Sequence, residues 1–279
     1  NGQLWSRLLH MQVSAVDKFR LNGRVCLLTG ATGHLGPFMA EALASAGAHV
    51  VLNAKNRDKV EELVSRLQTK NWQASSAAFD ITDEAALHTC IQAIEREHGR
   101  LDVIVHNATA GRPATFGEIG SADFEQVYRV NVVAGFQLLK AALPLLRKSA
   151  QLTAGSSVVN ISSMYGSVSP DPSIYGNSGA NNPPSYGPAK AGMMQLTRYA
   201  ACHLAAEKIR VNCLSPGPFP VQKYLDQDPE FAARLREKVP MRRTGEPCEL
   251  QGPLLFLASD ASSFVTGINL PVDGGWTAW

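Results

Sequence analysis

An apolar run, a glycine-rich turn and a helical pattern follow one another without a break near the start of the chain. The run Arg24–Thr29 (RVCLLT) has the aliphatic character of a buried parallel strand. It stops at Gly-Ala-Thr-Gly-His-Leu-Gly, residues 30–36, and Pro37 is then well placed to open a helix over 37–46. Glycines at such a turn permit the close approach of a pyrophosphate, whose charge meets the helix N-terminus. We therefore expect a dinucleotide to bind here, rather than a plain strand-to-helix turn, with these contacts: Gly30, Thr32, Gly33, His34, Leu35 and Gly36.

The end of the second expected strand, His49–Asn53, bears on the choice between NAD and NADP. A dinucleotide fold that selects NAD places an acidic side chain there for the ribose 2′-hydroxyl. This chain has no acid before Asp58 and offers Lys55 and Arg57, whose charges suit a 2′-phosphate. We predict NADP(H) as the cofactor, with Lys55 as a ligand and NAD(H) as the alternative. A solvated loop with two ordinary charges is the other interpretation.

Strand-like apolar runs alternate with helical patterns along the rest of the chain, with no break in composition. Further strands are expected at 73–79, 101–106, 157–161, 209–213 and 268–272. Further helices are expected at 59–69, 84–98, 124–146, 191–207, 230–238 and 250–259. This alternation predicts an α/β fold with a single doubly wound parallel sheet (Rossmann-like), helices on both faces and ligands outside the carboxyl ends of the strands.

The domain organisation follows from the same pattern. We expect residues 1–20 to be an N-terminal extension and residues 21–279 to form one Rossmann-like domain. The polar, proline-punctuated segment at about 218–247 is long for a connection, which predicts a lid.

The composition excludes several other classes of protein. It is 45% hydrophobic and 18% charged with a formal net charge of +2 and has no basic tract, so nucleic acid is not an expected partner. No apolar run reaches the length of a membrane span, and residues 1–20 lack a signal-peptide pattern, so no membrane partner is expected. The cysteines and histidines show no metal-ligand spacing, which predicts no metal site and reduced thiols in a cytoplasmic protein.

Tyr186 and Lys190 lie four residues apart at the opening of a helical run, so a helix places them on the same face. An ammonium group close to a phenol favours the phenolate and lowers its pKa, by about 1–3 units. Such a pair suits general acid/base chemistry near neutral pH. Taken alone the pair is a weak motif, because the same spacing is common on amphipathic surface helices.

Asn131 lies within the long helical pattern between valines, where a buried amide needs hydrogen-bond partners. It is either a structural residue or part of a site. Each of the other polar features follows the end of an expected strand, which places them at one edge of the sheet. They are residues 30–36, 53–57, 80–81, 107–111, 163 and 216–219.

In this order the features resemble the short-chain dehydrogenase/reductase family, from about Phe19 to Trp276. The matching residues are Thr29 and Gly30 through Gly36, Asp80, Ile81, Asn107, Ala108, Asn131, Ser163, Tyr186, Lys190, Pro216 and Gly217. The ordered set is far more specific than its glycines alone. Family members are usually tetrameric, so the resemblance implies a homotetramer or a homodimer.

The resemblance also implies a role for each site residue. Tyr186 is the acid/base, and Lys190 binds the nicotinamide ribose and lowers the pKa of the tyrosine. Ser163 steadies the substrate oxygen, and Asn131 holds a water molecule of the proton relay behind the lysine. Asp80 and Ile81 would flank the adenine. The remaining cofactor contacts implied are Asn107, Ala108, Tyr186, Lys190, Pro216, Gly217 and Phe219.

The chain departs from the family pattern at several positions. His34 stands where the main branch has glycine, and His106 replaces the first residue of Asn-Asn-Ala-Gly. Phe219 and Val221 replace the usual aliphatic residue and threonine after Pro-Gly. Ser163 is preferred to Ser162 because Gly166 then completes the family's Ser-x-x-Gly spacing.

The largest departure is an insert, residues 167–183, which lengthens the usual gap between the serine and the tyrosine. Its own tyrosine, Tyr175, has no lysine four residues on and is rejected as the acid/base. The insert is rich in turn formers and carries Asn177, Asn181 and Asn182. We expect this loop to wall the substrate pocket, with a passive surface elaboration or a subunit contact as the alternative.

These observations predict an NADP(H)-dependent oxidoreductase that interconverts a secondary alcohol and a ketone, with a small-molecule substrate. The insert and the opening Phe-x-Leu-x-Gly-Arg resemble branches that act on sugar acids and polyols. A 3-oxoacyl thioester reductase is the alternative substrate class, and a non-catalytic dinucleotide-binding regulator is the alternative from another functional class. The complete set of Ser163, Tyr186 and Lys190 disfavours the regulator, because a redox sensor needs no acid/base.

Overall fold

The computed structural model describes residues 14–176 and 181–279, and within them the strands form one parallel sheet. The order of the seven strands described is β3-β2-β1-β4-β5-β6-β7, so the chain starts in the middle of the sheet and reverses direction at β4. The strands are β1 (Val25–Thr29), β2 (His49–Ala54), β3 (Ala74–Ala78), β4 (Val103–His106), β5 (Ser156–Ile161), β6 (Ile209–Pro216) and β7 (Asn269–Val272). The predicted doubly wound fold is confirmed.

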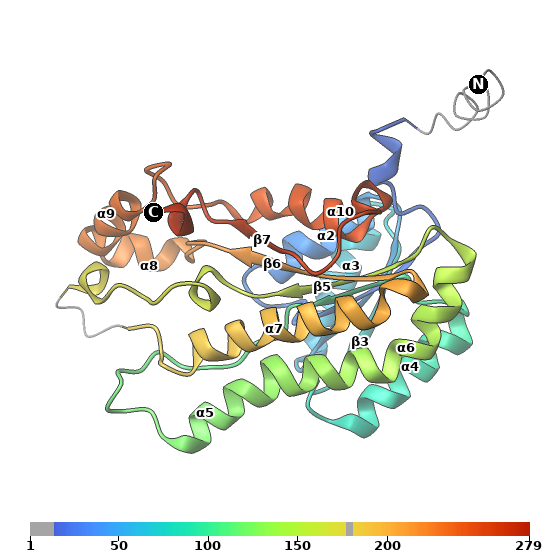
Figure 1. The fold of residues 1–279 in the computed structure, drawn as a ribbon, viewed down its shortest axis with the longest axis horizontal. Helices are drawn as coiled ribbons and strands as arrows, with labels where there is room; N and C mark the ends of the chain where they lie inside the picture. Colours follow the sequence, from blue (N-terminus) through green and yellow to red (C-terminus); the bar gives the residue numbers. More distant parts are fainter. Residues whose placement is uncertain (1–13, 177–180) are drawn as a thin grey trace.

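Helices cover both faces of the sheet, as Figure 1 shows. One face carries α2 (Gly36–Ser45), α3 (Arg57–Gln68) and α10 (Gln251–Ala258). The other face carries α4 (Glu84–His98), α6 (Ala134–Leu152) and α7 (Tyr186–Leu204), with α5 (Ser121–Tyr128) leading into α6. The side-chain cap of Asn56 on the Lys59 amide starts α3, and Asp83 caps α4 in the same way.

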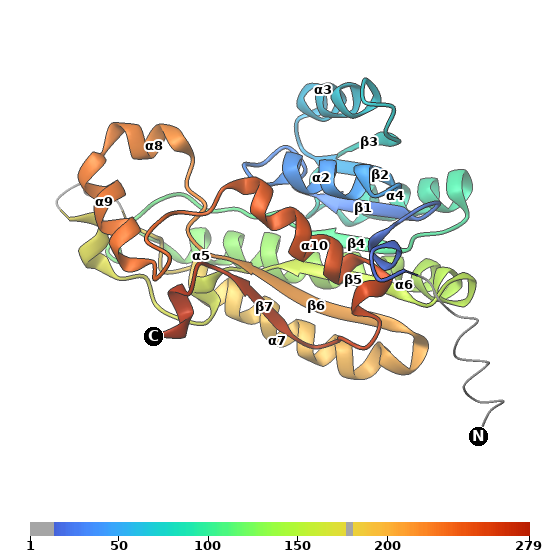
Figure 2. The ribbon, with the colours of Figure 1, turned by 90° about the horizontal axis from the view of Figure 1, so that it is seen from above.

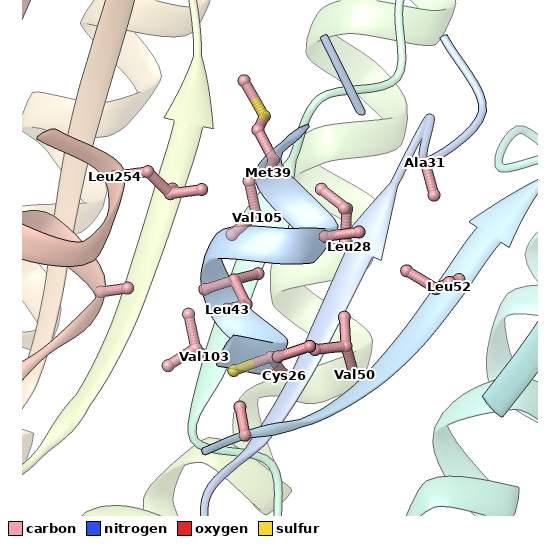
Figure 3. Packing of buried hydrophobic residues seen from close by; sticks show 14 of the residues in the cluster. Cys26, Leu28, Ala31, Met39, Leu43, Val50, Leu52, Val103, Val105 and Leu254 are labelled. Carbon is pink, nitrogen blue, oxygen red and sulfur yellow. The ribbon is translucent and has the colours of Figure 1, made fainter. Parts of the chain in front are cut away.

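The hydrophobic core lies in two layers, one between the sheet and each set of helices. Every residue of β1 is buried, because a central parallel strand is covered on both faces. Figure 3 shows the layer beneath α2, where Met39 and Leu43 pack on Leu28 and Val105. This packing holds both elements that flank the glycine turn, β1 and α2, in the hydrophobic core.

The long helical pattern at 124–146 is not one regular helix. A π-helical turn, Arg129–Val133, joins α5 to α6 and contains Asn131. The stretch Ser121–Leu152 is long and apolar enough to cross a membrane by length and composition, so the expectation that no run reaches that length was wrong. It packs against α4 and the sheet as a core helix of this fold.

Two short helices follow β6 beyond the carboxyl edge of the sheet, α8 (Gln222–Gln227) and α9 (Pro229–Lys238). Only the second was predicted. Figure 2 shows both at the end of the molecule where the C-terminus lies. Among the described residues of the insert, 172–175 form a 3-10 turn that contacts α9. Asn177 and residues 1–13 of the predicted extension lie outside the described residues.

Candidate active site

The turn after β1 requires its glycines. Gly30 has φ +62°, and a Cβ there would lie 2.8 Å from the Cα of Ala108 in the loop after β4. The Asn107 side-chain amide donates to the Gly30 carbonyl at 2.9 Å, which holds the two strand-end loops together. A Cβ on Gly36 would lie 2.4 Å from the Ala31 carbonyl oxygen, so this glycine lets α2 pack against the turn.

A cavity of about 530 Å³ runs along the carboxyl edge of the sheet from the second strand end to α7. Of the predicted site residues, these line it: Gly30, Thr32, Gly33, His34, Leu35, Lys55, Ile81, Asn107, Ala108, Ser163, Tyr186, Lys190, Pro216, Gly217 and Phe219. Gly36, Asp80 and Asn131 do not line it. Gly217 packs so closely on Asp273 that a Cβ would lie 2.4 Å from its Cα.

The end of the cavity beside β2 differs from the prediction in its charges. Lys55 forms an ion pair at 2.8 Å with Asp80, the residue expected to flank the adenine. This ion pair and hydrogen bonds from Thr82 lower the pKa of Asp80 against the opposing effect of burial. Arg57 pairs with Glu61 on its own helix and does not line the cavity, whereas Lys59 does. Of the two cations predicted to meet a 2′-phosphate, Lys55 therefore lines the cavity and Arg57 does not, and Lys59 is a further lysine on its wall.

A buried chain of hydrogen bonds joins the glycine turn to the π-helical turn, and the sequence had not indicated it. The Thr29 hydroxyl oxygen accepts from the amides of Asn107 and Ala108, both at 3.1 Å, and the hydroxyl lies 3.1 Å from His106 Nδ1. His106 Nε2 lies 3.0 Å from the main-chain carbonyl of Asn131. Because a carbonyl only accepts, Nε2 carries the proton and Nδ1 accepts from Thr29. Burial lowers the pKa of His106 to about 4, so the imidazole is neutral at working pH.

Asn131 is placed by the π-helical turn rather than by a regular helix. Its side-chain amide donates to the Val127 carbonyl at 2.9 Å, and its side-chain oxygen is buried without a partner among the described residues. Such turns often occur at functional sites. Asn131 does not line the cavity, whereas its neighbour Val130 does, and its main-chain carbonyl faces His106.

Ser163, Tyr186 and Lys190 are brought together by β5 and the start of α7. Lys190 is buried and donates from Nζ to the Ile161 carbonyl at 2.9 Å. Ser162 donates its hydroxyl to the Lys190 carbonyl at 2.9 Å, which leaves Ser163 as the serine facing the tyrosine. Ser163 hydrogen-bonds the Tyr186 oxygen. The lysine ammonium lies 5.5 Å from the centre of the tyrosine ring.

Burial dominates the titration of both groups. It raises the pKa of Tyr186, against a lowering effect of the Ser163 hydrogen bond, and it lowers the pKa of Lys190 to about 8. The expected lowering of the Tyr186 pKa is therefore not found in this structure, because burial disfavours the phenolate and the Lys190 ammonium is held by the Ile161 carbonyl.

A smaller cavity of about 280 Å³ adjoins Ser163 and Tyr186. The insert contributes Ile174, Tyr175 and Asn182 to its wall, and α9 contributes Phe231 and Leu235, which sequence reasoning missed. Asn181 lines a different cavity, on the outer side of the insert. Within residues 14–176 and 181–279, no group of three or more His, Cys, Asp or Glu side chains could hold a metal ion.

Comparisons with known proteins match nearly the whole chain. A family model described as "Enoyl-(Acyl carrier protein) reductase" matches residues 30–277. The rhamnolipids biosynthesis 3-oxoacyl-(acyl-carrier-protein) reductase of Pseudomonas aeruginosa is 32% identical over 260 residues, which cover 92% of this chain and 98% of that protein.

Solved structures also match nearly the whole chain. The gluconate 5-dehydrogenase of Burkholderia cenocepacia, in complex with NADP and tartrate, has a TM-score of 0.85 and 30% identity, covering 95% of this chain and 100% of that one. An NAD+-bound xylitol dehydrogenase has a TM-score of 0.81 and 34% identity, covering 91% and 99%. These relatives differ in substrate and in cofactor while sharing one architecture.

Proposed function

Because the chain belongs to the short-chain dehydrogenase/reductase family, it is an NAD(P)-dependent oxidoreductase acting on CH–OH groups, and we propose that it uses NADP(H) to interconvert a secondary alcohol and a ketone. The observation that carries this proposal is the position of Tyr186 and Lys190 beside Ser163, at the end of the cavity that begins at the glycine turn.

The residues present fit a dinucleotide. The glycine turn leaves no room for a Cβ at Gly30 or Gly36, and such a close backbone turn at a helix N-terminus suits a pyrophosphate. The other residues that would hold the cofactor are Thr32, Gly33, His34, Leu35, Lys55, Ile81, Asn107, Ala108, Tyr186, Lys190, Pro216, Gly217 and Phe219. When bound, the nicotinamide supplies or accepts the hydride.

The side chains of the protein move the proton. In reduction, Tyr186 donates its phenolic proton to the substrate oxygen, and Ser163 hydrogen-bonds the same oxygen. Lys190 is the next donor behind the tyrosine, and its pKa of about 8 lets it exchange a proton near working pH. Asn131, fixed by His106, holds the far end of this relay.

NADP(H) is favoured over NAD(H) by the charges at the end of β2. Lys55 and Lys59 line the cavity there, and the strand ends in Asn53 and Ala54 instead of an acid. The ion pair with Asp80 is compatible with this role, because Lys55 is 62% exposed and can turn toward an added phosphate.

A sugar acid or a polyol is the substrate class we favour, and a 3-oxoacyl thioester is the alternative. Polar groups of the insert beside Tyr186 support the first, and the similarity to the Pseudomonas aeruginosa reductase supports the second. Following NADPH absorbance with purified protein and a panel of ketones, ketoses, sugar acids and acyl thioesters tests the proposal. Binding of NADPH without turnover on any compound would favour a non-catalytic regulator.

Assembly and location stay predictions. Exposed apolar side chains on the π-helical turn, α6 and α7, namely Val133, Phe136 and Tyr199, support a homotetramer or a homodimer that packs through this face. The described cysteines form no disulfide, which supports a reducing, cytoplasmic compartment.

A further inference from the structure

The smaller cavity beside Tyr186 has a roof made of two segments far apart in the sequence. Tyr175 of the insert stacks on Phe231 of α9, with ring centroids 5.8 Å apart and an interplanar angle of 17°. Arg234 donates from Nε to the Ile174 carbonyl at 3.0 Å. Lys238 pairs with Asp171 at 3.0 Å on the outer side. The insert and the lid are therefore joined, and together they define what can lie next to the reacting oxygen.

The two cationic side chains of this roof, Arg234 and Lys238, are bound to other groups and do not line the cavity. Arg234 is held by the Ile174 carbonyl and by Glu230 at 3.3 Å, and Lys238 is held by Asp171. None of the described residues that line the smaller cavity carries a charge at neutral pH. Residues 177–180 are Asn-Ser-Gly-Ala and bring no charge by sequence. A carboxylate that enters this cavity therefore meets no cationic partner on its described walls.

Within the part of the chain that the structure describes, one polar atom of the cavity wall is an acceptor without a partner. The side-chain oxygen of Asn182 is buried and has no hydrogen-bond partner among the described residues. This oxygen is an acceptor in need of a donor, which a substrate hydroxyl supplies once the Asn182 side chain turns toward the cavity, whereas a carboxylate or the carbonyl of an acyl thioester supplies none. The phenols of Tyr165 and Tyr175, which hydrogen-bond each other, add further polar edges to an otherwise apolar wall. Such a wall with a few placed polar groups is typical of a small-molecule site.

From this cavity we infer that the substrate is an uncharged polyhydroxylated compound, a polyol or the corresponding ketose, rather than a sugar acid or an acyl thioester. The inference rests on the proposed function and narrows it. Asn182 accepts a hydrogen bond from a substrate hydroxyl, and the stacked rings of Tyr175 and Phe231 cover the carbon skeleton.

The first test compares kcat/KM of the purified protein with NADP(H) on matched compounds. Xylitol, sorbitol and fructose represent the uncharged class, gluconate and 5-ketogluconate the anionic class, and an acetoacetyl thioester of N-acetylcysteamine the acyl class. We expect the best uncharged compound to exceed every anionic and acyl compound by at least about tenfold, which is roughly 1.4 kcal/mol. A higher kcat/KM on an anionic or acyl compound overturns the inference but leaves the proposed function standing. NADPH binding without turnover on the whole panel overturns both.

The second test adds the missing cation. Phe231→Arg places a guanidinium that can still stack on Tyr175, and Phe231→Met removes the ring without adding charge. Relative to Phe231→Met, Phe231→Arg should raise the gluconate-to-xylitol ratio of kcat/KM by at least about tenfold. An unchanged ratio contradicts the inference.

The third test removes the acceptor. Asn182→Ala should raise KM for the uncharged substrate about tenfold with kcat and the NADPH Kd unchanged, as expected for a lost binding contact of roughly 1.4 kcal/mol. Gln227→Ala, an exposed amide on α8, is the matched control and should change neither constant. Equal KM values in the wild type and Asn182→Ala would refute the role of this residue.

Discussion

Burial of the Lys190 ammonium makes a quantitative prediction about stability against pH. In the folded chain the pKa of this group is lowered from 10.5 to about 8, and desolvation is the main cause. Between those two pH values the unfolded chain binds more protons at this position than the folded chain does. The free energy of unfolding therefore rises with pH in this window, by about 1.4 kcal/mol per pH unit, or roughly 3 kcal/mol in all. Below pH 8 the contribution is absent, because both states are protonated.

Other buried groups act in the opposite direction at alkaline pH. Burial raises the pKa of Tyr186 and raises that of Cys213 to about 11, so the unfolded chain loses these protons first and stability falls. The contribution of Lys190 is isolated by the difference between the wild type and Lys190→Met, whose unbranched apolar side chain fits the same space.

The assay is urea unfolding followed by far-ultraviolet circular dichroism, at intervals from pH 7.5 to 9.5 with a reductant present. The stability of the wild type relative to Lys190→Met should rise by roughly 2 kcal/mol between pH 8 and 9.5. Lys223→Met, which removes an exposed lysine of α8, controls for the loss of one positive charge and should show no such rise. A flat or falling difference for Lys190→Met would show that the ammonium is not desolvated, and the relay role based on its pKa would fail with it.

Three further outcomes are expected. Tyr186→Phe should lower kcat by about 10²–10⁴ with the NADPH Kd unchanged; near wild-type kcat would mean that another residue is the acid/base. Ala54→Asp with Lys55→Ala should shift the kcat/KM preference toward NAD, because the new carboxylate repels a 2′-phosphate; a wild type that already prefers NAD refutes the cofactor proposal. His106→Ala leaves the carbonyl of the π-helical turn without its donor and should lower kcat but not NADPH affinity, with partial recovery in His106→Asn; equal losses in both variants would contradict a hydrogen-bonding role.

The fold could be predicted because each strand carries its own signal. The strands β1, β4 and β5 are buried at every position, and each ends in a polar or glycine-rich turn. The chemistry of the site follows from the same rule, since parallel strands bring their carboxyl ends to one edge. Thr29 and His106 are paired across β1 and β4 in the register observed. That register depends on packing between strands far apart in the chain, so the contact between these side chains could not be read from either segment alone.

The direction of the Tyr186 pKa marks a second limit of sequence reasoning. The four-residue spacing predicts proximity to Lys190, and the structure places the ammonium near the ring. Whether proximity lowers the phenol pKa depends on how much water both groups lose and on which acceptor holds the lysine. The burial of both groups and the acceptor of the lysine are set at the end of β5, where the Ile161 carbonyl accepts a hydrogen bond from the Lys190 ammonium. A motif therefore indicates which groups meet, and burial decides how they titrate.

The lid and the insert extend this reasoning to substrate choice. Each was recognised as a loop, from its length and its turn-forming residues, but their partnership depends on contacts such as Lys238 with Asp171, which are 67 residues apart. Arg234 and Lys238 are held by these contacts and do not line the smaller cavity, so its described wall carries no charge. The chain does contain cations near this cavity, namely Arg234 and Lys238. Selection against an anionic substrate would then arise because other groups hold these cations. Asp171→Asn removes the carboxylate that pairs with Lys238. The ratio of kcat/KM on uncharged substrates to kcat/KM on anionic substrates should then decrease, because Asp171 no longer holds the ammonium.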